Sequence, residues 1–256
     1  MKKLLYIITC LMLMTTSCEF FELDNLPGPD ATVAGKFIDS KTGETVQMEY
    51  YQGALCGQLA VIEQGWDYEA IQYWLCKYDG TYRNDRIFAA EYRIESTRLN
   101  VFPFTSTLNL SKGDNNDVDF TVTPYCRIVN PQITYDAATK KIMATFTVEM
   151  GDDTKINVVP QVQFCASTDK FVGKYFNLVG SDPGARKTNI TPGTTVTLSI
   201  DTQLGANDPQ FHYVRDHYVR IAALAQGGGH NSNGLWNFSP VFKISSDFST
   251  ITEVEW

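Results

Sequence analysis

The stretch KIMATFTV, residues 141–148, decides the fold class. Apolar side chains occupy every second position from Ile142 to Val148, and the positions between them hold Lys141, Met143 and two threonines. A period of two places successive side chains on opposite faces of a strand, so that one face is buried and the other is wet. The stretch therefore predicts an antiparallel strand with one face in a core.

The same pattern recurs on both sides of this stretch, and helical periodicity is sustained nowhere. Short strand signals lie near residues 33–38, 59–62, 71–78, 92–94, 118–122, 158–164, 196–200, 219–223 and 242–244. Many short strands at this spacing are typical of a sandwich. Pro124-Tyr125 follows one strand directly and then the pattern restarts. We therefore expect an all-β protein with two β-sandwich domains in tandem, residues 31–123 and 124–256.

The N-terminus has the features of a bacterial lipoprotein signal. Lys2 and Lys3 precede an uncharged stretch over residues 4–14, and Thr15-Thr16-Ser17 leads into Cys18. The apolar run is too short to span a bilayer as a helix. We expect residues 1–17 to be removed, Cys18 to be lipidated, and residues 18–30 to form an acidic tether. An ordinary secretory signal cut elsewhere, or an N-terminal membrane helix, is the alternative.

Charge and cysteine content narrow the function classes further. Removal of Lys2 and Lys3 with the signal leaves 19 basic and 29 acidic residues, a net charge of −10, and no basic run occurs. A nucleic-acid partner is disfavoured, because phosphate contacts need clustered Lys and Arg. Four cysteines remain in the two domains, an even number that permits disulfides in an exported protein. Buried free thiols are the simpler interpretation for Cys56, Cys76, Cys126 and Cys165.

Two segments of the first domain carry a family resemblance. Residues 31–46 read ATVAGKFIDSKTGETV, with Gly35, Asp39 and the Thr42-Gly43-Glu44 turn, and Asp79-Gly80 is followed by Tyr82. Together they resemble the carboxypeptidase-regulatory-like domain, which implies a transthyretin-like β-sandwich. Ala90-Glu91-Tyr92 stands where that domain has Gly-Thr-Tyr. Asp79-Gly80 is also a strong signal for a hairpin.

Nearly the whole predicted mature chain resembles a family of Bacteroidetes lipoproteins of unknown function. The segments that carry this likeness are Val122-Thr123-Pro124-Tyr125 and residues 79–84, DGTYRN. The resemblance implies an immunoglobulin-like or fibronectin-III-like second domain and an outer-membrane location at the cell surface. It also implies a polysaccharide-utilisation locus with SusC- and SusD-like partners. The family brings no established catalytic or binding residues, so none is carried over.

No motif in the sequence predicts catalysis, a metal site or a cofactor. The three histidines, His212, His217 and His230, lie near no cysteine in sequence, and no Gly-x-Ser-x-Gly elbow occurs. Residues 114–119, DNNDVD, offer oxygen ligands but lack the glycine and distal glutamate of a calcium loop. We expect no enzyme activity, and we interpret residues 114–119 as a polar turn before a strand.

Aromatic residues are the best candidates for a binding site. Trp66 and Tyr68 stand in Gln64-Gly65-Trp66-Asp67-Tyr68, where glycine and acid indicate a loop. Tyr73 and Trp74 point to opposite faces of one strand, so both cannot be core if one face is wet. An exposed flat ring can stack on the C–H face of a sugar. The candidate ligand-binding residues are Trp66, Tyr68, Trp74 and Trp236.

These observations predict a lipid-anchored surface protein that captures polysaccharide or oligosaccharide beside a SusC/SusD-like importer. Two alternatives stay open. The first is a structural or adhesive subunit of the fimbrial type, which would need a proteolytic site that frees a groove for a donor strand. The second is an assembly partner of the importer that binds no sugar. The glycan, the membrane face, the oligomeric state and the angle between the domains are not predicted.

Overall fold

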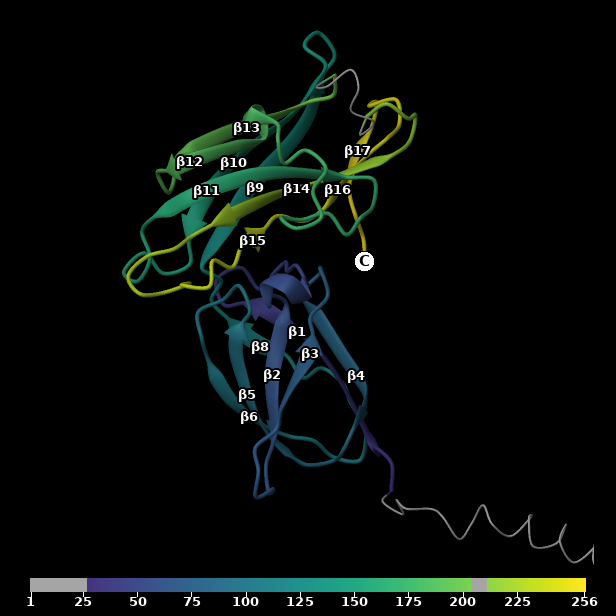
Figure 1. Cartoon of the computed structure of the whole chain (residues 1–256), viewed down its shortest axis with the longest axis vertical. Coiled ribbons are helices and arrows are strands. Elements are labelled where there is room, and N and C mark those ends of the chain that lie inside the picture. The colour runs from purple at the N-terminus through teal and green to yellow at the C-terminus, as the bar shows by residue number, and fades with distance from the viewer. Residues whose placement is uncertain (1–26, 204–210) are drawn as a thin grey trace, which may run out of the picture.

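The computed structural model describes residues 27–203 and 211–256, and it is built almost entirely from strands (Figure 1). The prediction of an all-β protein with sandwich domains is confirmed. The predicted signal, residues 1–17, and lipid-bearing Cys18 lie outside the described residues, as does most of the tether. In the part of the chain that is described, no helix has the length and apolar character needed to cross a bilayer.

The first unit consists of two sheets of four strands. One sheet has β1 at its centre, paired antiparallel with β4 and in parallel with β7 and β8. Its members are β1 (Ala31–Asp39), β4 (Thr81–Ile87), β7 (Gly113–Asn115) and β8 (Phe120–Val122). The second sheet has the order β3 (Ile71–Leu75), β2 (Gln58–Glu63), β5 (Glu91–Arg98) and β6 (Thr105–Asn109). Side chains from both sheets, including Phe37, Leu59 and Tyr92, meet in one core.

The second unit also consists of two sheets. A three-stranded sheet has the order β13 (Thr195–Asp201), β10 (Lys141–Met150) and β9 (Cys126–Asp136). The facing sheet contains β12 (Arg186–Ile190), β11 (Val159–Ser167), β14 (His217–Leu224), β16 (Phe242–Ile244) and β17 (Ile251–Glu253), with β15 (Asn237–Phe238) beside β14. The described residues add only two single 3-10 turns, Gln52–Ala54 and Pro183–Ala185. Phe146, Phe164 and Ile221 lie in the shared core.

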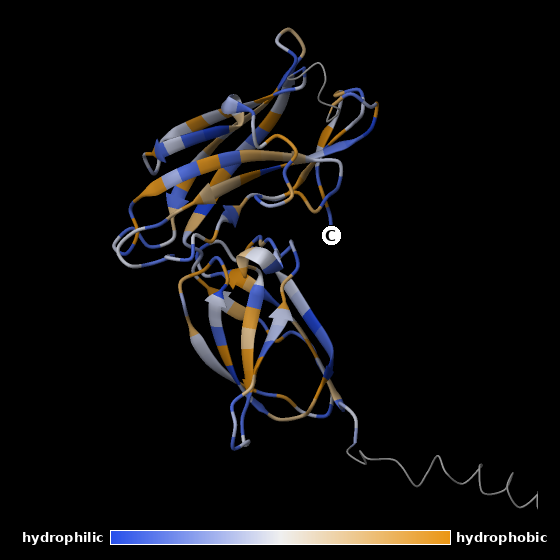
Figure 2. Cartoon of the chain, viewed as in Figure 1, coloured by the Kyte–Doolittle hydropathy of each residue, from blue (hydrophilic) through white to orange (hydrophobic). Residues whose placement is uncertain are grey.

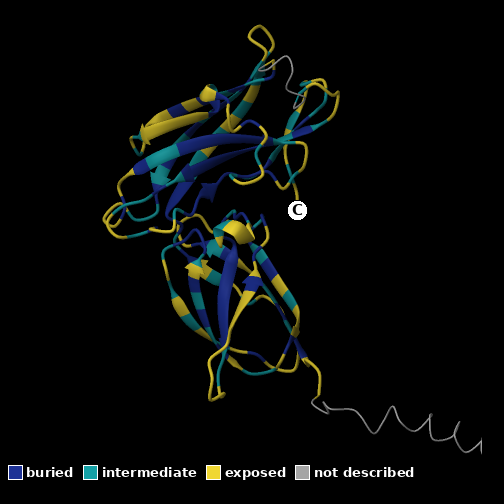
Figure 3. Cartoon of the chain, viewed as in Figure 1, coloured by how far each residue is buried: buried dark blue, intermediate teal, exposed yellow. Residues whose placement is uncertain are grey.

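The alternation that predicts β10 is confirmed by burial. Ile142, Ala144, Phe146 and Val148 are buried, and the residues between them are partly exposed. Figure 2 shows the corresponding banding of apolar and polar residues along the strands, and Figure 3 shows β2, β11 and β14 mostly buried. Central strands such as β2 are covered on both faces, which explains why residues 59–62 read as a continuous apolar run.

The predicted hairpin at Asp79-Gly80 is present but short, and one antiparallel bridge joins Cys76 to Tyr82 across the turn. The turn does reverse the chain, with a hydrogen bond from the Lys77 N–H to the Thr81 carbonyl. Beyond this bridge the strands separate: β3, before the turn, pairs with β2, and β4, after the turn, pairs with β1, so the two strands belong to different sheets. Gly80 has φ +79, and a Cβ there would collide with the Val46 carbonyl oxygen. The turn is therefore a corner between sheets, packed against the chain that follows β1.

A second close approach explains the glycine in β1. A Cβ at Gly35 would overlap the Val118 carbonyl oxygen. The Tyr82 hydroxyl donates a hydrogen bond of 2.6 Å to the same oxygen. Gly35 and Tyr82 are two of the residues that carry the family resemblance, and both lie against the Val118 carbonyl oxygen. They fix the segment before β8 against β1.

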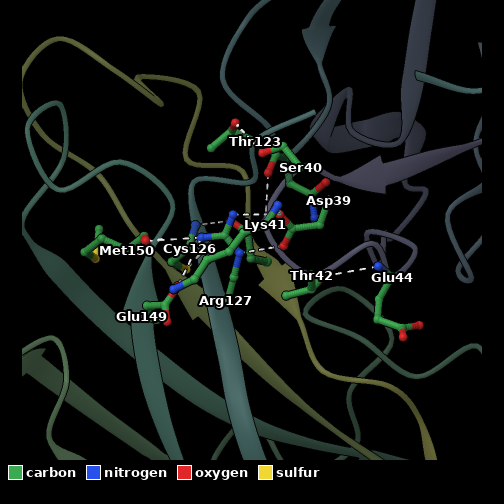
Figure 4. Close-up of polar contacts among 12 residues, drawn as sticks. Asp39, Ser40, Lys41, Thr42, Glu44, Thr123, Cys126, Arg127, Glu149 and Met150 are labelled. Atoms are coloured by element: carbon green, nitrogen blue, oxygen red, sulfur yellow. Dashed lines mark hydrogen bonds and ion pairs between the residues drawn. The ribbon is translucent and has the colours of Figure 1, made fainter. Parts of the chain in front are cut away.

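A buried ion pair joins the two units where the chain passes from one to the other (Figure 4). Arg127, the second residue of β9, donates to both carboxylate oxygens of Asp39 at the end of β1, at 2.5 and 2.7 Å. Both side chains are almost fully buried. Arg127 also donates to Glu149 at 3.2 Å, and Lys41 contacts the same carboxylate at 2.8 Å. The network fixes the first strand of each unit to the other.

This ion pair predicts a loss of stability in acid. Burial by itself raises the pKa of Asp39, but hydrogen bonds from Arg127 and the Lys41 N–H outweigh it and hold the pKa below its ordinary value. A carboxyl with a lowered pKa in the folded state stabilises above its unfolded pKa of about 3.9, and that stabilisation is lost as pH falls through the folded pKa. We expect the free energy of unfolding to fall below pH 4, measured by urea titration at several pH values.

The Asp39→Asn variant is expected to be less stable than the wild type at pH 7 and to lose less stability on acidification. Asp85→Asn is the matched control, because Asp85 pairs with Arg83 on an exposed face. Identical pH profiles for Asp39→Asn and the wild type would contradict the assignment.

Candidate functional site

An aromatic cleft lies where the two units meet, near the C-terminus of the chain in Figure 1. Its walls come from the Asp79-Gly80 corner of the first unit, from the loop after β11, and from the last residue, Trp256. The cleft has a volume of about 820 Å³. That size falls in the range of small-molecule sites, which span roughly 300–1,000 Å³. Aromatic side chains dominate the lining: Tyr50, Tyr78, Phe171, Phe176 and Trp256.

Three of these rings form one contiguous cluster. Tyr78 packs edge-on against Phe171 at 5.3 Å between ring centroids, and stacks on Trp256 at 6.0 Å with an interplanar angle of 27°. Phe171 and Trp256 are 5.7 Å apart. Tyr78 is buried, whereas Phe171 is 49% and Trp256 41% exposed. The buried ring therefore supports two others that are each about half exposed to solvent.

Charged groups border the aromatic cluster on both sides of the junction. Lys77 and Asp79 come from the first unit, and Asp169 and Lys170 come from the second. The Lys170 ammonium lies 4.5 Å from the Trp256 ring centroid. Asp169 accepts the Phe171 N–H at 3.0 Å, which fixes the backbone of that loop. The cleft thus combines flat apolar surfaces with hydrogen-bonding groups of both signs.

Glu49, from the first unit, holds the loop of the second unit that carries the rings. Its carboxylate is buried and accepts the backbone N–H groups of Tyr175 at 2.9 Å and Lys174 at 3.1 Å. Burial raises the pKa of Glu49, and the Tyr175 N–H, the charge of Arg220 and the Lys174 N–H offset part of that rise. Phe176, which follows directly, lines the cleft. The loop is therefore positioned by a side chain of the other unit.

The Glu49→Ala variant is expected to loosen this loop. Loss of a charged acceptor for two partly buried N–H groups should raise hydrogen exchange at the Lys174 and Tyr175 amides by about tenfold or more. Exchange mass spectrometry of the intact chain measures this, with the exposed Glu253→Ala as control. Unchanged exchange in residues 173–176 would show that the carboxylate does not order the loop.

Arg220 of β14 connects the same two units beneath the cleft. Its side chain is fully buried and donates to the carbonyls of Met48 and Ser239 at 2.8 Å and of Tyr78 at 3.3 Å. The guanidinium lies 5.4 Å from the Tyr78 ring centroid and 4.5 Å from that of Phe238. Burial lowers its pKa to about 10, and the charge of Glu49 limits the drop, so the group is protonated at neutral pH.

The structure separates the four aromatic residues that the sequence selects. Trp66 and Tyr68 are 67% and 81% exposed and line a different pocket at the β2–β3 turn. Trp74 is 3% exposed and packs against Tyr82 and Tyr92 in the first core, so it offers no free face. Its neighbour Tyr73 is the exposed member of that pair.

Trp236 is also not available to a ligand. It is 7% exposed and packs with Val172, Phe238 and Val241 in a small core cluster. Its carbonyl accepts a hydrogen bond from Asn100 of the first unit at 3.0 Å. A ligand role for Trp74 or Trp236 is therefore not carried further, because both rings are structural.

Phe171 and Trp256 are the functional candidates that sequence reasoning does not select. Phe171 is an apolar residue in the polar loop Ser167-Thr-Asp-Lys-Phe-Val, the same signal that selects Trp66. Trp256 follows Glu255, so it too is an aromatic residue beside an acidic one. Applied uniformly, the search for aromatic residues in polar loops would have found them.

Cys76 is part of the cleft lining as a buried free cysteine, and burial raises the pKa of its thiol. The interpretation of Cys56, Cys76, Cys126 and Cys165 as buried free thiols is confirmed. Burial raises the pKa of Cys56 to about 11, so it is a thiol at neutral pH. Over residues 27–203 and 211–256, no group of three or more His, Cys, Asp or Glu side chains could hold a metal ion.

Comparison with known proteins gives one family match. Residues 31–123 match the family model described as "Protein of unknown function (DUF3823) N-terminal domain". No curated protein is detectably similar to the chain.

Solved structures of similar proteins cover both units. A protein from Bacteroides uniformis, described as a "putative carbohydrate binding protein", is 30% identical with a TM-score of 0.74, over 89% of this chain and 100% of that one. A DUF3823 family protein from Parabacteroides merdae is 22% identical with a TM-score of 0.67, over 85% and 99%. Another from Bacteroides ovatus is 17% identical with a TM-score of 0.65, over 84% and 99%. None of these descriptions names a catalytic activity.

Proposed function

We propose that this chain, whose first unit belongs to the DUF3823 N-terminal domain family, is a lipid-anchored surface protein that binds glycan in the aromatic cleft. The 30% identical relative from Bacteroides uniformis is described as a carbohydrate-binding protein in the words given above, which supports this ligand class. We further propose that the first sandwich is transthyretin-like and the second immunoglobulin-like. The proposed role is non-covalent capture, without turnover.

The half-exposed rings of Phe171 and Trp256 carry the proposal. Sugar rings present apolar C–H faces, and an aromatic ring with one free face can stack on them. Hydroxyls at the edge of the sugar then need donors and acceptors, which Lys77, Asp79, Asp169 and Lys170 supply. The cleft is largely preformed, since Glu49 and Arg220 fix its two walls from below. Preformed walls reduce the entropy lost on binding.

Anchoring is the second part of the proposal. The predicted lipoprotein signal over residues 1–17 supports a lipid on Cys18, and the acidic residues of the tether support export to the cell surface. We place the protein at the outer membrane beside a SusC/SusD-like importer. A capture protein there would raise the local concentration of glycan near the transport route.

One observation favours a second candidate function, assembly with a protein partner. The aromatic surface continues past the cleft through Phe176 to a stacked pair, Tyr51 and Tyr175, with ring centroids 4.6 Å apart. Leu55 and Leu75 are exposed nearby on the first unit. Contiguous apolar surface of this kind also marks protein interfaces. A fimbrial-type role has no comparable support among the described contacts.

The test is a polysaccharide screen of residues 19–256 by affinity gel and glycan array. The proposal expects retention on at least one polysaccharide, weakened by Phe171→Ala and unchanged by Trp66→Ala. If Trp66→Ala abolished retention on the polysaccharide, the glycan site would be at the β2–β3 turn and not in the cleft. Binding to no glycan, together with capture by the importer in a pull-down, would favour assembly.

A further inference from the structure

The loop between β2 and β3 presents large aromatic side chains to solvent. This tip loop, residues 64–70, contains the most exposed tryptophan and tyrosine of the described chain, Trp66 and Tyr68. Neither ring contacts another aromatic ring in the described structure. Phe88, at the β4–β5 turn, is exposed as well. Exposed aromatic rings lower solubility. Their presence here therefore indicates a binding partner with an apolar or interfacial surface.

The tip loop is held in place rather than loosely attached. Arg93 of β5 donates to both carboxylate oxygens of Glu69, at 2.8 and 2.9 Å. The Gln64 N–H donates to the Glu91 carbonyl at 2.8 Å, so the loop leaves β2 beside the start of β5. Gly65 has φ +96 and open space around it. These contacts fix both ends of the loop and leave Trp66 and Tyr68 at its outer edge.

The chain enters the first unit at the same end. Asp30, the last residue of the tether, accepts the Ala89 N–H at 2.9 Å and pairs with Lys112 at 3.0 Å. Ala31 lies opposite Ile87 in the β1–β4 ladder. Residues 27–30, the tip loop and the β4–β5 turn therefore share the end of the first unit that points away from the second unit (Figure 1). The aromatic cleft lies at the opposite end of the same strands.

We propose that this end faces a lipid bilayer and that Trp66 and Tyr68 enter its interfacial layer. The inference rests on the anchoring part of the proposed function. Twelve residues separate Cys18 from Ala31, and at most about 3.5 Å per residue gives a reach of roughly 45 Å. A lipid on Cys18 would thus bring this end of the molecule to the membrane first. Tryptophan and tyrosine are the side chains that gather at membrane–water interfaces.

The charges at this end indicate a neutral or zwitterionic lipid surface. The tip loop carries Asp67 and Glu69 and no basic residue. Arg93 and Lys112 are paired with Glu69 and Asp30, and Arg86, two residues before Phe88, is a single exposed cation among these acids. Attraction to anionic lipids needs a cluster of unpaired Lys or Arg at the surface. Contact through the rings would also fix the orientation of the protein on the membrane. The eight residues of β5, at about 3.3 Å per residue, separate the two ends of the first unit, so the cleft would lie about 25 Å or more from the lipid.

The test uses the full protein purified with its lipid and reconstituted into phosphatidylcholine vesicles with brominated acyl chains, which quench tryptophan at the interface. Co-flotation with the vesicles is measured first, since its failure would remove the anchor and overturn the inference at that step. We then expect quenching that Trp66→Phe reduces about twofold or more and Trp256→Phe leaves unchanged.

Two further results would overturn the inference while leaving the anchor intact. The first is co-flotation without any quenching that depends on Trp66. The second is loss of polysaccharide retention in Trp66→Ala, which would make the tip loop a sugar platform. Stronger quenching in vesicles that contain phosphatidylglycerol would contradict the choice of a zwitterionic surface.

Discussion

Replacing Arg220 with alanine is expected to lower the free energy of unfolding by about 3–5 kcal/mol, because removal of one member of a buried charged network leaves the rest unpaired. The guanidinium donates to carbonyls of Met48, Tyr78 and Ser239, and Glu49 would lose the positive charge that lowers its pKa. Urea denaturation followed by far-UV circular dichroism measures the change. Arg186→Ala, on an exposed strand, is the control and should stay within about 0.5 kcal/mol.

A double-mutant cycle separates the interaction between Arg220 and Glu49 from the loss of packing that each substitution causes. Arg220→Met keeps much of the side-chain length, and Glu49→Gln removes the opposing charge. If the two groups act together, the double variant should lose less stability than the two single variants combined. Strict additivity would contradict the coupling of Arg220 to Glu49. A loss in Arg220→Ala no larger than that in Arg186→Ala would contradict the role given to the buried guanidinium.

Replacing Trp256 with alanine is expected to weaken glycan binding by about 30-fold or more, the factor typical of a central aromatic residue in an interface. Trp256 is a half-exposed ring of the cleft lining, stacks on Tyr78 and has the Lys170 ammonium 4.5 Å from its ring centroid. Its removal deletes the stacking surface and displaces that ammonium. Calorimetric titration of the polysaccharide found in the screen gives the affinity of each variant.

Two variants control for indirect effects in this experiment. Trp66→Ala removes an exposed ring of equal size at the far end of the first unit and should leave affinity unchanged. Trp256→Phe keeps a flat ring and should restore part of the binding. Equal affinities for Trp256→Ala and the wild type would exclude the cleft as the glycan site.

Much of the fold could be predicted from the sequence because its signals are local. Alternation from Ile142 to Val148 gives the strand β10 and its buried face, since the period of a strand fixes both. Strand partners are not local. The Asp79-Gly80 turn looks like a hairpin, yet β3 and β4 diverge into different sheets. The turn residues specify the reversal, and the packing of Gly80 on the Val46 carbonyl specifies where the chain goes next.

The candidate site was harder to predict because it is assembled across the junction. Glu49 and Tyr175 are 126 residues apart in sequence, and Asp39 and Arg127 are 88 apart. Nothing near Glu49 marks it as an acceptor for another unit's backbone. The period of two shows that Tyr73 and Trp74 face opposite sides, but not which side is buried, and the structure buries Trp74. The sequence correctly predicts an exposed loop around Trp66. It does not predict that this loop and Asp30 lie at the same end of the first unit, because that depends on how the strands pair.

The most direct test of glycan binding in the cleft is oxidative footprinting of tryptophan side chains in the mature protein, with and without a saturating oligosaccharide. The account predicts protection of Trp256, together with Phe171, and unchanged oxidation of Trp66. Protection of Trp66 with Trp256 still fully reactive would contradict it.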